Sequence, residues 1–271
     1  MSNKFYMAGG VGNCLFQLNY CSHLRQKGVE IEVQTFLLTP SWFLKLIGWE
    51  FHSGTLDFLH DIGALENVKL SRGNIFDVAL LLLAKKFHLK EWKYKYIQTS
   101  ENIEDCIPSA KCITGHPHHG VPVNEAFVKS VQSRLQSYRR KEYSSVEGPV
   151  VHIRGGDFLK SKIKGMALGQ KYYAQIFKLF QNCTIITNDK TYVGALMKDF
   201  PSVTYSFSRA STVLDDFILL TSASELILSN STFSWWAAEL GTAETIYEPE
   251  FYYTHIDWRP NSLQRRITVH G

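Results

Sequence analysis

Short apolar runs alternate with amphipathic stretches along most of the chain. In the second half, PVVHIRG has the apolar run of a buried strand, and KYYAQIFKLF has apolar residues at helical spacing. The same alternation continues through CTIITND, KTYVGALMKDF, SVTYSF, LDDFILLTSA, ELILS, STFSWWAAELG and ETIYEPEFY. Strands and helices that alternate in this way predict an α/β protein in which helices cover parallel sheets.

The first half begins with the same pattern. KFYMA is a predicted strand, NCLFQLNYCSHLRQKG a helix and VEIEVQTFLL a second strand. Residues 40–110 are rich in helical patterns but less regular, with YKYIQ as a candidate strand; KCITG is a further strand and NEAFVKSVQSRLQSYRRK a helix. SSVEGP is a predicted linker, which gives two Rossmann-like domains, 1–147 and 148–271. We expect them to face a cleft, with ligands at the carboxyl ends of the strands.

Composition is typical of a globular protein. Of the 271 residues, 45% are hydrophobic and 20% are charged. No apolar run reaches the roughly 20 residues of a membrane helix, and the first residues lack the apolar core of a signal peptide. The five cysteines are an odd number without metal-ligand spacing, which favours reduced thiols and a cytoplasmic location.

The net charge of +4 is too small to indicate nucleic-acid binding. Basic residues nevertheless cluster in KKFHLKEWKYK, YRRK, LKSKIK and LQRR. These clusters are either ordinary solvated faces or a surface for anionic lipid headgroups or a diphosphate.

Three segments could carry chemistry, and each also has a structural interpretation. AGGVGN at 8–13 joins a strand to a helix, and is either a tight connection or a turn whose free N–H groups bind an anion. VHIRGGDF at 151–158 places Arg154 and Asp157 at a strand end, as a phosphate-binding pair or an interdomain salt bridge. SNST at 229–232 precedes a helix, where the hydroxyls either cap that helix or also contact phosphate.

Together the three segments resemble the motifs of the α-1,2-fucosyltransferases. AGGVGNCLFQL is similar to GGLGNQLFQYA of that family, VHIRGGDF to VHIRRGDY, and LSNSTFSWWAAEL to NSTFSWWAAWL, in the same order and at similar spacing. ITND at 186–189 is similar to the SDD of the family, and Asp216 falls where the family has an aspartate. The resemblance implies a metal-independent, inverting glycosyltransferase of the B type that uses GDP-fucose.

The resemblance also implies roles for individual residues. Arg154, supported by Asp157, would hold the β-phosphate and stabilise the charge that grows on the leaving diphosphate. The residues expected at the GDP-sugar are Gly10, Gly12, Asn13, His152, Arg154, Asp189, Asp216, Asn230, Ser231 and Thr232. The first domain would receive the acceptor and the second the nucleotide.

Two residues depart from the family pattern. Gly155 replaces the second arginine of the RR pair, and Cys14 replaces a glutamine. The loop ITGHPHHG brings His116, His118 and His119 to the expected acceptor side, as a polar wall, a plain surface loop or a metal site; we expect no metal. Trp235 points away from the apolar face of its helix and could line the cleft.

The predicted enzyme is therefore a galactoside 2-α-L-fucosyltransferase. Its partners would be GDP-fucose and a galactose-containing glycan of a bacterial surface polysaccharide or lipooligosaccharide, lipid-linked precursors included. Peripheral contact with the inner face of the membrane is expected, and nucleic acid is not. The departures keep two alternatives open: a donor such as GDP-colitose and a non-catalytic glycan-binding relative. A sulfotransferase that uses a different nucleotide is a further alternative.

Overall fold

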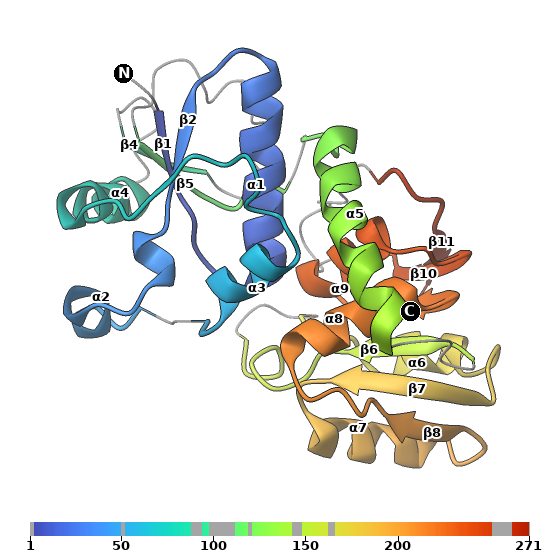
Figure 1. The fold of residues 1–271 in the computed structure, drawn as a ribbon. Helices are drawn as coiled ribbons and strands as arrows, with labels where there is room; N and C mark the ends of the chain where they lie inside the picture. Colours follow the sequence, from blue (N-terminus) through green and yellow to red (C-terminus); the bar gives the residue numbers. More distant parts are fainter. Residues whose placement is uncertain are drawn as a thin grey trace. The chain divides into compact units, whose positions relative to one another are not determined.

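The computed structural model describes residues 3–49, 52–87, 94–97, 112–118, 121–142, 148–161, 166–250 and 262–270. The chain divides into two compact units, Met1–Val131 and Gln132–Gly271, each of which is described by itself (Figure 1). The predicted boundary at 147/148 differs from this division, which falls inside one continuous helix, α5 (Glu125–Glu142). The acceptor and donor roles assigned to the two halves remain predictions.

The first unit contains a parallel sheet of five strands in the order β3-β2-β1-β5-β4. Its strands are β1 (Asn3–Tyr6), β2 (Ile31–Gln34), β3 (Leu70–Ser71), β4 (Tyr94–Ile97) and β5 (Cys112–Gly115). Its helices before α5 are α1 (Val11–Gln26), the 3₁₀ turn η1 (Phe36–Leu38), α2 (Trp42–Leu46), α3 (Thr55–Asp61) and α4 (Ile75–Phe87). The four strands expected in KFYMA, VEIEV, YKYIQ and KCITG are all present.

Helices cover both faces of this sheet because successive strand residues point to opposite sides. On β1, the ring of Phe5 lies 5.8 Å from that of Tyr20 on α1. Tyr6, the next residue, packs into a core cluster with Leu44 of α2 and Val78 of α4. Accordingly, α1 and α4 lie on opposite sides of the sheet (Figure 1).

The second unit contains a parallel sheet of six strands in the order β11-β10-β9-β6-β7-β8. Its strands are β6 (Val150–Ile153), β7 (Asn182–Thr187), β8 (Thr204–Phe207), β9 (Glu225–Ile227), β10 (Thr245–Pro249) and β11 (Ile267–Val269). Its helices after α5 are α6 (Gln170–Ile176), α7 (Lys190–Leu196), the 3₁₀ turn η3 (Met197–Asp199), α8 (Val213–Ser222) and α9 (Thr232–Leu240). The predicted alternation is confirmed throughout; β11, in the short C-terminal run RRITVH, was not predicted.

The side chains on the two faces of β6 pack against different helices. Val151 and Ile153 belong to the core cluster that also contains Tyr173 of α6 and Val193 of α7. His152, between them, points to the other face, where its ring lies 5.9 Å from that of Phe233 on α9. The expected α/β class, with one parallel sheet in each unit, is therefore confirmed.

The four cysteines among the described residues, Cys14, Cys21, Cys112 and Cys183, are buried, reduced thiols. This agrees with the predicted reduced thiols. Cys106 lies outside the described residues. None of the described helices is long and apolar enough to cross a membrane.

Candidate functional site

Three of the predicted segments meet at one edge of the second sheet. Strand β6 lies between β9 and β7, and all three run parallel. Their carboxyl ends therefore share an edge, and the loops that follow them, 154–158, 188–189 and 228–231, come together there. This edge is where parallel α/β sheets usually bind ligands.

Arg154 and Asp157 form an ion pair within the loop that follows β6. Nη2 of Arg154 lies 3.0 Å from Oδ2 of Asp157, and 27% of the arginine side chain is exposed. The guanidinium also lies 5.0 Å from the centre of the Phe158 ring. Nε of Arg154 is buried and has no hydrogen-bond partner among the described residues. The described ion pair of Arg154 is therefore local to its own loop, and phosphate binding by Arg154 stays a prediction.

Asn188, which the sequence interpretation did not single out, links this loop to the end of β7. Its Oδ1 accepts a hydrogen bond from the backbone N–H of Gly155 at 3.0 Å. Its Nδ2 donates to Oδ1 of Asp157 at 3.3 Å, so that both oxygens of this carboxylate are bound. Asn188 therefore orients Asp157, which in turn pairs with Arg154. The signal in the sequence was its place between a strand end and a helix cap.

Asp189, expected at the GDP-sugar, uses both of its oxygens inside the protein. One accepts from the backbone N–H of Tyr192 at 2.9 Å and caps α7, and the other accepts from the N–H of Gly156 at 3.0 Å. The hydrogen bonds from Tyr192 and Gly156 lower the pKa of the Asp189 carboxyl. The described contacts of Asp189 are thus those of a helix cap and a loop clamp.

The packing around Gly155 leaves no room for a side chain. A Cβ atom at this position would lie 2.8 Å from Cβ of Asp189 and 3.0 Å from Cδ1 of Tyr192. Gly156 has a φ of 55° in the left-handed region, where glycine is favoured. The departure from the double-arginine motif is therefore matched by neighbouring residues that fill the space.

His152 is buried at the end of β6 and bound to the next strand. Its Nδ1 lies 2.7 Å from Oγ of Ser229, which follows β9. Burial, and secondarily the charge of Arg154, lowers the pKa of His152 to about 3. The imidazole is therefore neutral at physiological pH, and its described contact joins β6 to the segment after β9.

The polar run after β9 begins α9. Ser231 is the N-cap, and its Oγ accepts from the backbone N–H of Phe233 at 3.3 Å. Nδ2 of Asn230 donates to the carbonyl of Met166 at 3.1 Å, which ties down the start of another described segment. Ser229, Asn230 and Ser231 are buried, whereas Thr232 is half-buried. The capping interpretation of Ser231 is confirmed, and phosphate contact by this run stays a prediction.

Asp216 lies in the first turn of α8, close to the end of β8. Its Oδ1 accepts from Oγ of Ser208 at 3.0 Å, and burial raises the pKa of the carboxyl. The adjacent Asp215 has a different task, because it forms a capping box with Thr212. Asp216 is the one of this pair that is not used to cap its helix.

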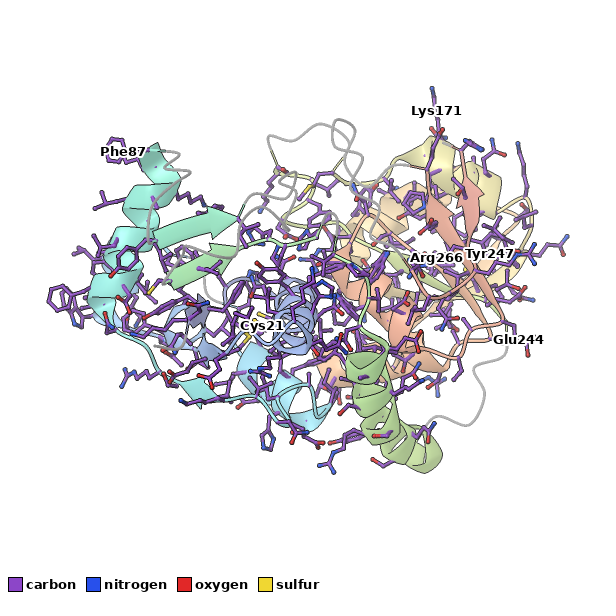
Figure 2. All side chains as sticks on the ribbon, turned by 90° about the horizontal axis from the view of Figure 1, so that it is seen from above. Cys21, Phe87, Lys171, Glu244, Tyr247 and Arg266 are labelled. Atoms are coloured by element: carbon purple, nitrogen blue, oxygen red, sulfur yellow. The ribbon has the colours of Figure 1, made fainter. Side chains whose placement is uncertain are left out.

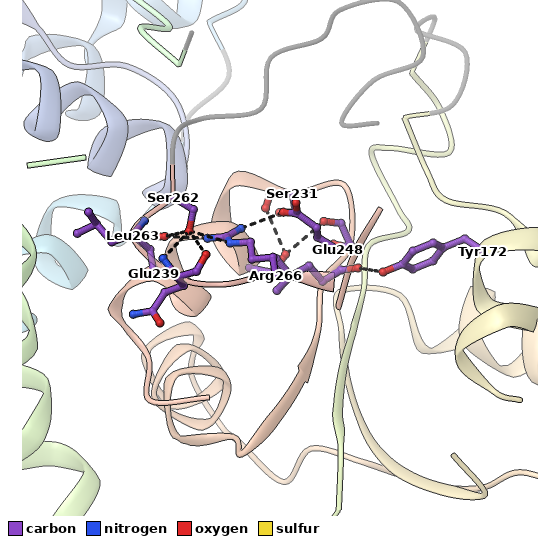
Figure 3. Close-up of polar contacts among 11 residues, drawn as sticks. Tyr172, Ser231, Glu239, Glu248, Ser262, Leu263 and Arg266 are labelled. Atoms are coloured by element: carbon purple, nitrogen blue, oxygen red, sulfur yellow. Dashed lines mark hydrogen bonds and ion pairs between the residues drawn. The ribbon is translucent and has the colours of Figure 1, made fainter. Parts of the chain in front are cut away.

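Trp235 does not line a cleft, which corrects the expectation for this residue. Its side chain is 1% exposed, and the guanidinium of Arg266 lies 4.6 Å from the centre of its ring. Arg266 in turn contacts Glu239 at 2.9 Å and Glu248 at 3.2 Å. Figure 3 shows Arg266 among Glu239, Glu248 and Ser262. The ring is covered by a C-terminal residue whose position the helical pattern alone could not reveal.

In the first unit, AGGVGN forms the turn from β1 into α1. Gly10 is the N-cap of α1, which places Gly12 and Asn13 in its first turn. Gln17, fully buried and not predicted, donates to the carbonyl of Gly115 at 2.8 Å and exchanges two hydrogen bonds of 3.0 Å with the backbone of Ala8. The glycine turn is thus fixed to the carboxyl end of β5.

Of the histidines after β5, His118 is not part of an open polar wall. His118 is 5% exposed, and its ring lies 4.5 Å from Phe16 and 5.6 Å from His116. Burial lowers the pKa of His116 to about 4 and that of His118 well below its ordinary value, so both are neutral. The acceptor-side expectation is therefore wrong for His118 and stays a prediction for the half-buried His116. His119 lies outside the described residues. In the described part of the chain, no three His, Cys, Asp or Glu side chains gather to hold a metal.

Comparison with solved structures finds distant likenesses. The E. coli heptosyltransferase WaaC with ADP is 9% identical with a TM-score of 0.48, covering 100% of this chain and 93% of that chain. The fucosyltransferase NodZ from Bradyrhizobium is 12% identical with a TM-score of 0.42, at coverages of 96% and 100%. POFUT1 in complex with GDP is 7% identical with a TM-score of 0.39, at coverages of 87% and 94%.

Comparison of sequences gives a firmer result. No curated protein matches the chain. The family described as Glycosyl transferase family 11 does match, over residues 74–255. The match covers more than half of the chain and includes every candidate residue discussed above in the second unit.

Proposed function

The chain belongs to glycosyl transferase family 11, and from this premise we propose that it transfers L-fucose from GDP-β-L-fucose to the 2-hydroxyl of a terminal galactose. The acceptor is a galactose-containing glycan of a bacterial surface polysaccharide or lipooligosaccharide. The reaction inverts the anomeric carbon and needs no metal ion.

The observation that carries this proposal is the position of Arg154. The guanidinium is held by Asp157 at the carboxyl edge of β6, and its buried Nε has no partner among the described residues. Breaking the bond between fucose and GDP leaves a diphosphate whose negative charge grows in the transition state. A guanidinium that is already oriented stabilises this charge more in the transition state than in the ground state.

The remaining polar groups of this edge complete the donor site. Ser231 and Thr232 stand at the N-terminus of α9, where N–H groups favour an anion. Asp216 offers a carboxylate oxygen to the base of the nucleotide, close to Ser208. His152 is a neutral side chain whose contact with Ser229 fixes the start of this polar run. Gly10, Gly12 and Asn13 are expected to contact the diphosphate on the family resemblance alone.

One observation favours a second donor. A site with the double-arginine motif can place two guanidiniums at the diphosphate, whereas Asp189 and Tyr192 fill the space around Gly155 here. Another GDP-6-deoxyhexose, such as GDP-colitose, is therefore the alternative donor.

The test is turnover with a panel of galactosides and both donors. We expect GDP release with GDP-fucose and a fucosylated product in mass spectra, with the linkage and inversion visible by NMR and no loss of rate in chelator. If only GDP-colitose gave a product, it would replace GDP-fucose as the proposed donor. GDP binding without turnover of any GDP-6-deoxyhexose would make the protein a non-catalytic glycan binder. Stabilisation by adenosine 3′,5′-bisphosphate but not by GDP would indicate a sulfotransferase.

A further inference from the structure

Helix α4 has an apolar stripe that the described residues of its unit leave exposed. Phe76, Leu83 and Phe87 are 77%, 43% and 61% exposed, respectively. Their spacing of seven and then four residues places them on one face of the helix. Val78 and Leu81, on a different face, are buried in the core cluster under the helix. The helix is therefore apolar on two faces, and the sheet covers only one.

Helix α2 presents the same kind of surface. Trp42 and Leu46, one turn apart, are 74% and 75% exposed, whereas Leu44 between them is buried. Both α2 and α4 pack on one core cluster, and both lie on the side of the sheet away from α1 (Figure 1). Figure 2 shows Phe87 extending outward at the end of α4.

The exposed charged residues that α2 and α4 themselves carry all have one sign. The exposed charged residues of α2 and α4, both fully described, are Lys45, Lys85 and Lys86. The acidic residue of these two helices, Asp77, is buried and paired with Lys4 at 2.9 Å. Nζ of Lys86 also lies 5.7 Å from the centre of the Phe87 ring, so a cation accompanies the apolar stripe.

We propose that the outer side of α2 and α4, called here the apolar–basic face, docks on an anionic lipid bilayer. Exposed aromatic and leucine side chains enter the boundary between headgroups and acyl chains, and lysines beside them bind the lipid phosphates. Helix α4 lies in the plane of the interface, because its 13 residues are too few to cross a bilayer.

The charge of the apolar–basic face favours an anionic bilayer over a second copy of the chain. A two-fold dimer places the same patch of each subunit against its copy. Lysine would then face lysine across the contact, and like charges in an interface oppose association. An anionic bilayer satisfies both the apolar and the basic part of the face. The inference does not rest on the proposed donor or acceptor, since membrane binding requires neither.

The test is flotation of the full chain with vesicles of phosphatidylcholine alone or mixed with phosphatidylglycerol. We expect binding to the mixed vesicles that weakens in salt. Leu83→Ser/Phe87→Ser should weaken the partition coefficient at least about tenfold, because two apolar side chains are lost. Lys45→Glu/Lys86→Glu should weaken the partition coefficient more than about tenfold. Loss of each lysine accounts for about fivefold, and the reversed charge adds to this effect. Lys178→Glu/Leu179→Ser, a pair that is also exposed but lies in the second unit, should bind like the wild type.

Three results would overturn the proposal. The wild type could fail to float with the mixed vesicles, or float equally with both. Leu83→Ser/Phe87→Ser could bind as the wild type does. Light scattering could show a dimer that this variant dissociates, which would assign the face to a second copy. If the serine variant loses its thermal transition, Lys45→Glu/Lys86→Glu decides alone, because it changes only exposed side chains.

Discussion

Nη2 of Arg154 lies 3.0 Å from Oδ2 of Asp157, three residues further along the chain. The second oxygen of Asp157 is bound by Asn188, from the end of the neighbouring strand. Two loops therefore orient one guanidinium through hydrogen bonds within the protein. Such preorganisation is what allows a positive group to stabilise a developing charge without further rearrangement.

Arg154→Ala should lose most activity and keep its fold. We expect a loss of about 2–4 kcal/mol of transition-state stabilisation, the range for loss of an oxyanion donor. Arg154→Lys should retain part of the activity, because it keeps the charge but lacks the planar fork. The measurements are kcat/KM with GDP-fucose and the melting temperature. Near-normal turnover of the alanine variant would refute the assigned role.

Asn188→Ala should lower kcat through Arg154. Loss of the hydrogen bond to Asp157 frees the ion pair to move, and a roughly three- to tenfold decrease is expected from the usual value of one hydrogen bond. The same substitution in an Arg154→Ala background should change kcat no further, because the two side chains act as one unit. Equal effects in both backgrounds would mean that Asn188 is only structural.

Gly155→Arg should destabilise the protein and not raise its activity. Its Cβ would approach Asp189 and Tyr192 to 3.0 Å or less, and overpacking of this kind costs about 1–3 kcal/mol. The control is Gly194→Ala in α7, where a Cβ meets nothing within 4 Å. That change should stabilise slightly, since alanine is the better helix former. Denaturant unfolding of both variants provides the comparison, and an unchanged Gly155→Arg would contradict the packing argument.

Asp77→Asn should remove a pH-dependent part of the stability. Burial alone would raise the pKa of Asp77, but hydrogen bonds from Lys4 and Tyr6 outweigh it and lower the pKa below its ordinary value. A carboxyl with a lowered folded pKa stabilises above its unfolded pKa, and this contribution is lost as pH falls through the folded value. At neutral pH the variant should be less stable by about 1–3 kcal/mol.

The measurement for Asp77→Asn is urea unfolding at a series of pH values. The difference in the free energy of unfolding between the variant and the wild type should be largest above the unfolded pKa of about 4 and should decrease at lower pH. A difference that stays constant down to the lowest pH would contradict the assigned charge.

Arg266→Met should destabilise the second unit strongly. Glu239 and Glu248 would both lose their cation, and 0% and 10% of these side chains are exposed. Removing one partner of buried ion pairs costs about 3–5 kcal/mol. Arg265→Met is the matched control, because Arg265 is exposed at the adjacent position. Equal melting temperatures for the two variants would show that the buried pairs contribute little.

Local patterns predicted most of the elements because their causes are local. The apolar run of β6 and the spacing of Phe233, Trp236 and Leu240 on α9 are properties of neighbouring residues, and both elements formed as expected. The elements in the middle of the first half were harder to predict. Helix α4 is apolar on two faces, and strand β3 has only two residues. Short elements carry too few residues for a period to be read.

Site residues followed the same division. The sequence indicated the strand ends that carry Arg154 and Ser231, because strand, turn and capping signals adjoin one another in the chain. Asp216 was indicated only by the resemblance to the family. The sequence could not indicate Asn188 as the partner of Asp157, nor Gln17 as the partner of Gly115, since these contacts join segments 31 and 98 residues apart.

The sequence by itself determined the alternation of elements, the family and the loops that carry the candidate chemistry. Only the tertiary structure decided which side chains remain available. It buried Trp235 under Arg266 and His118 beside Phe16, and it left Phe76 and Phe87 exposed beside lysines. The physical reason is that a helical or strand period specifies the direction of a side chain relative to its own element. Burial depends on what another part of the chain places in that direction.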